Sequence, residues 1–179
     1  LIFIHGGSRR QMFLGYHDRI FYHWAYGINQ YFANKGYVVL SVNYRSGIGY
    51  GKEFRNAPGR GSRGNTEYRD ILAAGLYLQG REDVDPDRVG LWGLSYGGIL
   101  TNYVITRTDR FKGAVSGASM GLLISNFGHD HYQLENEREW GNPWETREIW
   151  EELSPWNGIA NATTPTLFMG GEVDWNVPI

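Results

Sequence analysis

Five residues in the middle of the chain, Gly93-Leu94-Ser95-Tyr96-Gly97, constrain the fold more than any other part of the sequence. They stand between an apolar segment over 88–94, which predicts a strand, and a segment over 96–107, which predicts a helix. A serine on such a turn is held in a strained conformation with its hydroxyl outside the sheet, and the flanking glycines leave room for the turn. The motif therefore predicts Ser95 as a nucleophile. The alternative is an ordinary glycine-rich turn in which the serine only caps the helix.

The order of apolar segments predicts the fold class. Strands are expected over 1–4, 37–42, 88–94, 112–118 and 165–169, and they alternate with expected helices over 24–35, 66–80, 96–107 and near 145–153. Such alternation is typical of a parallel sheet covered on both faces. We therefore predict an α/β protein with an incomplete α/β-hydrolase fold. Two segments fall outside the alternation: a glycine-rich loop over 43–64, and an irregular, lid-like region over 120–144.

Length and composition exclude several classes of protein. A chain of 179 residues is long enough for one domain, so we expect residues 1–179 to form a single, partial catalytic domain without a second one such as a propeller. The net charge of −2 disfavours nucleic acid and membrane surfaces as partners. Because there is no cysteine, disulfides and thiolate sites are excluded. We expect no cofactor and no metal. The compartment stays open, with the cytoplasm slightly favoured, and the sequence does not address the oligomeric state.

A second glycine motif, Ile4-His5-Gly6-Gly7, closes the first predicted strand. In hydrolases of this fold a glycine-rich loop at this place contributes one N–H group to the oxyanion hole, and the residue after the nucleophile contributes another. Gly7 and Tyr96 are therefore the predicted oxyanion donors. Alone, two glycines after a strand would indicate no more than a turn.

The acid of a catalytic triad should follow the serine and stand at the end of a later strand. Asp174 fits, because it comes shortly after the predicted strand over 165–169. Its carboxylate would orient the imidazole and stabilise the imidazolium. Glu172 is the competing residue, and a surface turn without a catalytic role is the other alternative.

Several segments together resemble the prolyl oligopeptidase family of serine peptidases: IHGG, GYVVLSVNYRSGIGYGKEF, EYRDILAAGLYL, VDPDRVGLWGLSYGG and SPWNGIANATTPTLFMGGEVDWNVP. The resemblance implies cleavage of short peptides and an N-terminal β-propeller, which this sequence does not contain. It also implies that Tyr50 donates its hydroxyl to the oxyanion, as a tyrosine of the glycine-rich loop does in several members. Finally, it places the catalytic histidine some tens of residues after the aspartate.

The histidines depart from that pattern, because all five of them precede Asp174: His5, His17, His23, His129 and His131. The chain also begins with Leu1 inside an apparent strand. We therefore expect the parent protein to be longer at both ends, with its catalytic histidine downstream. Loss of the general base typically costs on the order of 10⁶ in turnover, so the chain alone is expected to be nearly inert. His129 and His131 could form a metal pair or a substitute base, but exposed loop histidines are the simpler interpretation.

Two weaker signals have simple explanations. The spacing Gly59-x-Gly61-x-x-Gly64 matches a dinucleotide fingerprint, but no strand precedes it. Arg9 and Arg10 could bind a substrate carboxylate, or they could be solvated loop residues.

The predicted function is a serine-type peptidase that hydrolyses oligopeptides through an acyl-enzyme on Ser95. An esterase of the same fold and a non-catalytic interaction domain are the alternatives.

Overall fold

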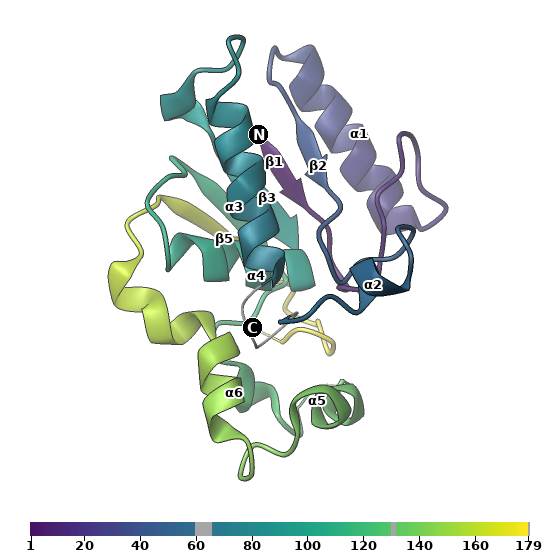
Figure 1. Cartoon of the computed structure of the whole chain (residues 1–179), viewed down its shortest axis with the longest axis vertical. Coiled ribbons are helices and arrows are strands. Elements are labelled where there is room, and N and C mark those ends of the chain that lie inside the picture. Colours follow the sequence, from purple (N-terminus) through teal and green to yellow (C-terminus); the bar gives the residue numbers. More distant parts are fainter. Residues whose placement is uncertain (60–65, 130–131, 179) are drawn as a thin grey trace.

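The computed structural model describes residues 1–59, 66–129 and 132–178, and its centre is a parallel sheet of five strands. The strands are β1 (Ile2–Ile4), β2 (Leu40–Val42), β3 (Leu91–Leu94), β4 (Ala114–Gly117) and β5 (Thr166–Met169). They lie in the order β2-β1-β3-β4-β5, and every neighbouring pair is parallel (Figure 1). The parallel sheet predicted from the alternating segments is thereby confirmed.

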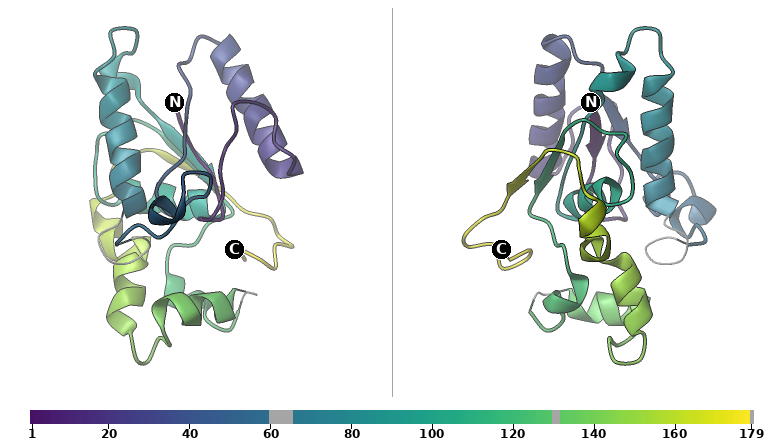
Figure 2. Two further views of the ribbon diagram at one scale, coloured as in Figure 1. Left: turned by 45° about the vertical axis from the view of Figure 1, so that its right-hand side comes forward. Right: turned by 90° about the vertical axis from the view of Figure 1, so that its left-hand side faces the viewer.

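Helices cover both faces of this sheet, as predicted. One face packs on α1 (Ile20–Asn34), whereas α3 (Thr66–Gln79) and α4 (Tyr96–Ile105) cover the other (Figure 2). The reason is the alternation of side chains along each strand. Phe3 of β1 points to the α1 side, where it packs with Trp92, whereas its neighbours Ile2 and Ile4 point into the larger core under α3 and α4.

The start of α1 differs from the prediction. The helix begins at Ile20, four residues earlier than expected, and Arg19 at its N-cap makes no side-chain capping hydrogen bond. Sequence-based boundaries depend on capping residues, so a helix that starts without one gives no signal at its true beginning. By contrast, the helix expected over 66–80 matches α3 closely.

The region over 120–144, expected to be irregular, contains a 3₁₀ turn over Leu123–Asn126 and the helix α5 (Gln133–Trp140). That expectation was wrong for a physical reason. No residue of α5 is buried, so its sequence has no apolar face to give a helical period. The helix is held at its end instead, where Trp140 packs edge-on against Trp150 of α6 (Arg147–Leu153), with ring centroids 5.0 Å apart.

The remaining elements are short. They are α2 (Lys52–Arg55) in the glycine-rich loop and the 3₁₀ turns Pro86–Arg88 and Pro155–Asn161. The carboxyl ends of the strands point to the side of the molecule where α5 and α6 lie, so these helices stand at the carboxyl edge of the sheet (Figure 1). In parallel α/β sheets this edge is where ligands bind. None of the helices in the described ranges is long and apolar enough to cross a membrane.

Candidate active site

Ser95 lies on a sharp turn between β3 and α4, with a positive φ of 58° and ψ of −127°. Its N–H donates to the Gly117 carbonyl of the neighbouring strand at 3.0 Å. Its carbonyl accepts from the N–H groups of Gly98 and Ile99 at 2.8 and 3.0 Å. Although Ser95 is the N-cap residue of α4, its side chain makes no capping hydrogen bond. The interpretation of this serine as a simple helix cap is therefore not supported.

Glycines make this turn possible because backbone from three strands converges on it. A Cβ on Gly97 would overlap the Ile4 carbonyl oxygen, and a Cβ on Gly93 would overlap the Gly97 carbonyl. A Cβ on Gly98 would stand 2.5 Å from the Gly117 carbonyl oxygen. Each glycine thus permits a backbone contact that a side chain would prevent.

The loop after β1 lies directly against this turn. A Cβ on Gly6 would be 2.7 Å from the Leu94 carbonyl oxygen and 3.1 Å from the Ser95 Cβ. Gly7 follows with a φ of 48°, a conformation that suits glycine. Two segments some 90 residues apart in sequence are therefore in contact at the residues predicted to form the oxyanion hole.

Ser95, Tyr96 and Gly7 line one cavity of about 530 Å³. Its apolar wall comes from α4, from the 120–144 region and from α6: Ile99, Leu100, Tyr103, Met120, Leu123, Trp140 and Leu153. Sequence analysis described 120–144 as lid-like but did not name its three wall residues, Met120, Leu123 and Trp140, since their positions follow no regular period. A cavity of this size, with an apolar wall on one side, suits a small ligand or one end of a peptide.

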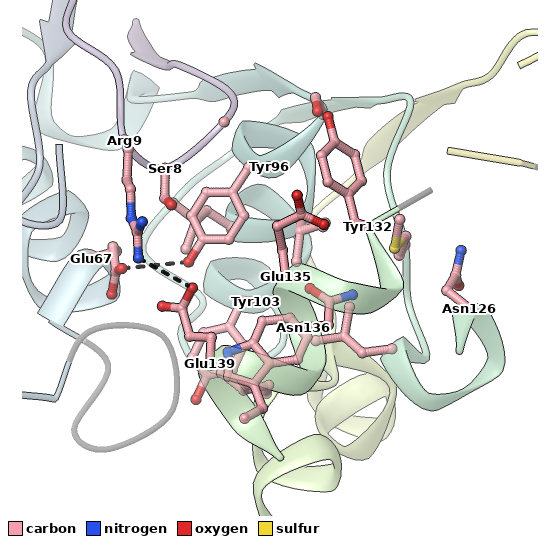
Figure 3. A pocket seen from close by; sticks show the side chains of 18 of the residues that line it. Ser8, Arg9, Glu67, Tyr96, Tyr103, Asn126, Tyr132, Glu135, Asn136 and Glu139 are labelled. Carbon is pink, nitrogen blue, oxygen red and sulfur yellow. Dashed lines mark hydrogen bonds and ion pairs between the residues drawn. The ribbon is translucent and has the colours of Figure 1, made fainter. Parts of the chain in front are cut away.

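Charged residues stand at the other side of the cavity (Figure 3). A guanidinium nitrogen of Arg9 lies 3.8 Å from a Glu139 carboxylate oxygen, so the pair joins the loop after β1 to α5. The Tyr96 hydroxyl donates to the Glu67 carboxylate at 3.4 Å, and Glu67 is only 2% exposed. Arg10 also lines the cavity. Both loop arginines therefore line the candidate site.

Asp174 follows β5, in the turn that the sequence predicts. Its Oδ1 atom accepts hydrogen bonds from the N–H groups of Asn176 and Val177, both at 2.9 Å. Val177 is buried and lines the cavity, whereas Asp174 does not. Asp174 thus fixes a turn that borders the site, and Glu172 in the same turn is exposed. The role of Asp174 as triad acid stays a prediction.

Tyr50 does not line the cavity. Its side chain is 55% exposed, its ring packs on Phe54 at a centroid distance of 4.8 Å, and its hydroxyl accepts a hydrogen bond from the Asn43 side chain at 3.1 Å. The family resemblance implies that this hydroxyl donates to the oxyanion. This role of Tyr50 also stays a prediction.

None of the histidines in the described residues lines the cavity. His129 is exposed on a loop, and His131 lies outside the described residues, as do Gly61 and Gly64 of the dinucleotide-like spacing. Over the described ranges no three acidic or imidazole side chains gather in a way that could hold a metal ion. The cavity-lining side chains of the described residues therefore include no histidine that could act as the general base for Ser95.

Sequence analysis named His5 in the motif Ile4-His5-Gly6-Gly7 but assigned no role to its side chain. It is fully buried, and its Nδ1 atom lies 3.0 Å from the carbonyl oxygen of Gly6. Burial lowers the pKa of His5 to about 4, so the imidazole is neutral at physiological pH. The ring stacks on Tyr44, with centroids 4.2 Å apart. Its place directly before the two glycines was the only sign in the sequence that this histidine has a structural role.

Comparison with known proteins places this geometry in a family. Residues 24–179 match the prolyl oligopeptidase family. A relative in Bacillus subtilis, named as an uncharacterized peptidase YuxL, is 37% identical over 158 residues, which cover 84% of this chain and 23% of that protein. The Pyrococcus horikoshii acylaminoacyl peptidase superposes with a TM-score of 0.81 at 28% identity, over 99% of this chain and 28% of that one.

A puromycin-hydrolyzing peptidase of Mycobacterium tuberculosis gives a TM-score of 0.80 at 30% identity, over 99% of this chain and 26% of that structure. The chain therefore spans about a quarter of the length of these proteins, all of which are named as peptidases. The two structural matches cover 99% of the chain, so they include the turn at Ser95, the sheet and the segments around the cavity. The chain has the α/β-hydrolase fold and belongs to the prolyl oligopeptidase family.

Proposed function

We propose that this chain forms most of the catalytic domain of a serine peptidase that cleaves oligopeptides through an acyl-enzyme on Ser95. The observation that carries the proposal is the strained Ser95, which faces a cavity of about 530 Å³ together with Gly7 and Tyr96. The peptidase names of the relatives support the same reaction class. Peptides are the proposed substrates, and no cofactor takes part.

In this reaction the Ser95 hydroxyl oxygen attacks the carbonyl carbon of the scissile peptide bond, and its proton passes to a histidine. The N–H groups of Gly7 and Tyr96 stabilise the negative charge on the carbonyl oxygen, and we keep Tyr50 as a third proposed donor. The C–N bond then breaks, the amine leaves with the proton, and water hydrolyses the acyl-enzyme. Asp174 orients the histidine, which in this proposal comes later in the polypeptide.

The test uses the complete gene product with peptide amide substrates and compares wild type with Ser95→Ala. The proposal expects a loss of kcat on the order of 10⁶, close to the limit of detection. A fluorophosphonate probe should label the wild type and not the variant. Equal amide hydrolysis by both proteins would contradict the proposal. Ester cleavage without amide cleavage would indicate an esterase, and a folded protein that neither reacts nor hydrolyses would indicate an interaction domain.

A further inference from the structure

We propose that Arg10 binds a carboxylate group of the substrate, so that the site favours peptides with a free carboxylate close to the scissile bond. The inference rests on the proposed function, because the carboxylate is placed relative to the bond that Ser95 attacks. It also assigns different roles to Arg10 and Arg9, which are neighbours in the loop after β1.

The two arginines of this loop differ in their partners. Arg9 has a side chain that is 58% exposed, and its guanidinium lies 3.8 Å from the Glu139 carboxylate. Arg10 is half-buried and lines the cavity. Over residues 1–59, 66–129 and 132–178, no carboxylate forms an ion pair with the Arg10 guanidinium and no acceptor takes a hydrogen bond from it. Within this part of the chain, a cation with five N–H donors therefore lines the cavity without an acceptor.

A carboxylate is the ligand that fits these donors. The guanidinium is planar, and two of its parallel N–H groups match the two oxygens of a carboxylate in charge-assisted hydrogen bonds. Donors that lack an acceptor in a partly buried place cost free energy, and a bound carboxylate removes this cost. The chemistry of Arg10 therefore favours a substrate with a carboxylate at this side of the cavity.

Arg10 is also held in place before any ligand binds. Its Cζ atom lies 5.4 Å from the ring centroid of Tyr22, a buried side chain, and an arginine that stacks on an aromatic face keeps the N–H groups at its edge free. The Arg10 carbonyl accepts from the Ile48 N–H of the glycine-rich loop at 3.0 Å, and the Arg10 N–H donates to the Ser8 carbonyl at 2.9 Å. Because side chain and backbone are both held, binding requires little further ordering of this residue.

The position of Arg10 limits how far the carboxylate can be from the reacting bond. The Nε atom of Arg10 lies 2.5 Å from the point that a Cβ on Gly7 would occupy. That point is about 2.5 Å from the Gly7 nitrogen, so Nε lies within about 5 Å of this nitrogen. A scissile carbonyl oxygen that accepts from the Gly7 N–H at about 2.9 Å is then within about 8 Å of Nε. Since one residue of extended chain spans about 3.5 Å, the carboxylate belongs within about three residues of the scissile bond.

Two groups of a peptide offer this chemistry. One is the terminal carboxylate of a short leaving segment, and the other is the side chain of an aspartate or glutamate beside the scissile bond. Both present the same two oxygens, but only the first requires the peptide to end near the site. The experiment therefore has one arm for each group.

The test measures binding to the complete gene product with Ser95→Ala, so that binding is separated from acyl-enzyme formation. One pair of peptides is acetyl-Phe-Ala-Ala as the free acid and as the C-terminal amide. The other pair is acetyl-Phe-Asp-Ala amide and acetyl-Phe-Asn-Ala amide. Calorimetry gives the Kd of each peptide for Ser95→Ala alone and for Ser95→Ala combined with Arg10→Gln or Arg10→Lys.

Arg81→Gln, in the same Ser95→Ala protein, is the matched control. The Arg81 guanidinium also lies over a tyrosine ring, that of Tyr77, at 5.8 Å, but neither residue lines the cavity. The control therefore removes an arginine from a similar ring contact outside the proposed site.

We expect at least one carboxylate peptide to bind about tenfold more tightly than its neutral counterpart, because charge-assisted hydrogen bonds are stronger than neutral ones. Arg10→Gln should abolish this preference. Arg10→Lys should keep part of it, since an ammonium group retains the charge without the planar pair of donors. Arg81→Gln should leave it unchanged. A preference in the first pair assigns the site to a chain end, and one in the second pair assigns it to an acidic side chain.

Two results would overturn the proposal. One is an equal Kd within both pairs when Arg10 is intact, and this comparison needs no variant of Arg10 that might fail to fold. The other is a preference that survives Arg10→Gln, which would mean that another group binds the carboxylate. Failure of the proposed function is distinguishable from both, because it would appear as equal amide hydrolysis by wild type and Ser95→Ala, whereas the Kd ratios report binding alone.

Discussion

Gly97, in the first turn of α4, packs so closely on Ile4 that a Cβ would overlap the Ile4 carbonyl oxygen. The contact joins the helix that follows Ser95 to the strand that leads into the His-Gly-Gly loop. The two sides of the proposed oxyanion hole are therefore set by direct backbone packing.

This contact predicts that replacing glycine by alanine lowers stability at Gly97 in α4 and raises it at Gly27 in α1. Gly97→Ala should destabilise the protein by several kcal/mol, or prevent folding, because the overlapping atom is backbone and cannot move aside. Gly27→Ala in α1 is the matched control, since a Cβ there meets nothing within 4 Å. It should raise the free energy of unfolding by up to about 1 kcal/mol. Urea denaturation measures both, and a Gly97→Ala protein as stable as wild type would refute the packing argument.

The positive φ of Ser95 predicts that a glycine at this position would make the protein more stable than another small residue would. Ser95→Gly should be more stable than Ser95→Ala by about 1 kcal/mol, because only glycine adopts this conformation without strain. Neither variant can form an acyl-enzyme, so the comparison isolates backbone strain from catalysis. Equal unfolding midpoints for the two variants would show that the turn stores no such strain.

Burial of His5 predicts an acid dependence of stability. Its pKa is lowered from 6.5 to about 4 in the folded protein, so between these pH values the unfolded chain binds a proton that the folded protein does not. Stability should therefore fall as the pH drops from 6.5 to 4, by up to about 3 kcal/mol from this residue. The His5→Asn variant has no titratable group at this position, so its stability should not show this fall between pH 6.5 and pH 4. The measurement is the difference in unfolding free energy between wild type and His5→Asn, taken at pH 7 and again at pH 4. The same difference at both pH values would contradict the lowered pKa of His5.

An ion pair between Arg45 and Asp70 holds the glycine-rich loop to α3. The guanidinium of Arg45 donates to both carboxylate oxygens at 2.7–3.0 Å, and the Arg45 N–H donates to Asp70 at 2.7 Å. Asp70→Asn should cost about 1 kcal/mol, because a half-buried, bidentate pair is stronger than an exposed one.

The control is Asp83→Asn in the Arg81–Asp83 pair, which has similar distances of 2.6–2.8 Å but is exposed and lies within one turn. It should leave stability within experimental error. Equal effects of the two substitutions on the denaturation midpoint would mean that the Asp70 pair contributes no more than an exposed one.

The sequence by itself determined the strand-to-helix turn at Ser95 and the parallel sheet. These features depend on local requirements that are legible in the chain: glycines where backbone must approach backbone, and apolar segments of strand or helix length. The helix over 66–80 was predictable for the same reason, because its apolar residues recur at helical spacing on one face.

Only the tertiary structure decided which side chains face the site. Tyr44 lies 39 residues from His5 in sequence, and their contact turns a histidine of the motif into a buried donor to the loop. Tyr50, a few residues further on, is exposed and does not line the cavity, whereas the polar helix α5 supplies part of the wall although its sequence has no apolar period. The direction of a side chain depends on contacts between distant segments, and no pattern of neighbouring residues contains that information.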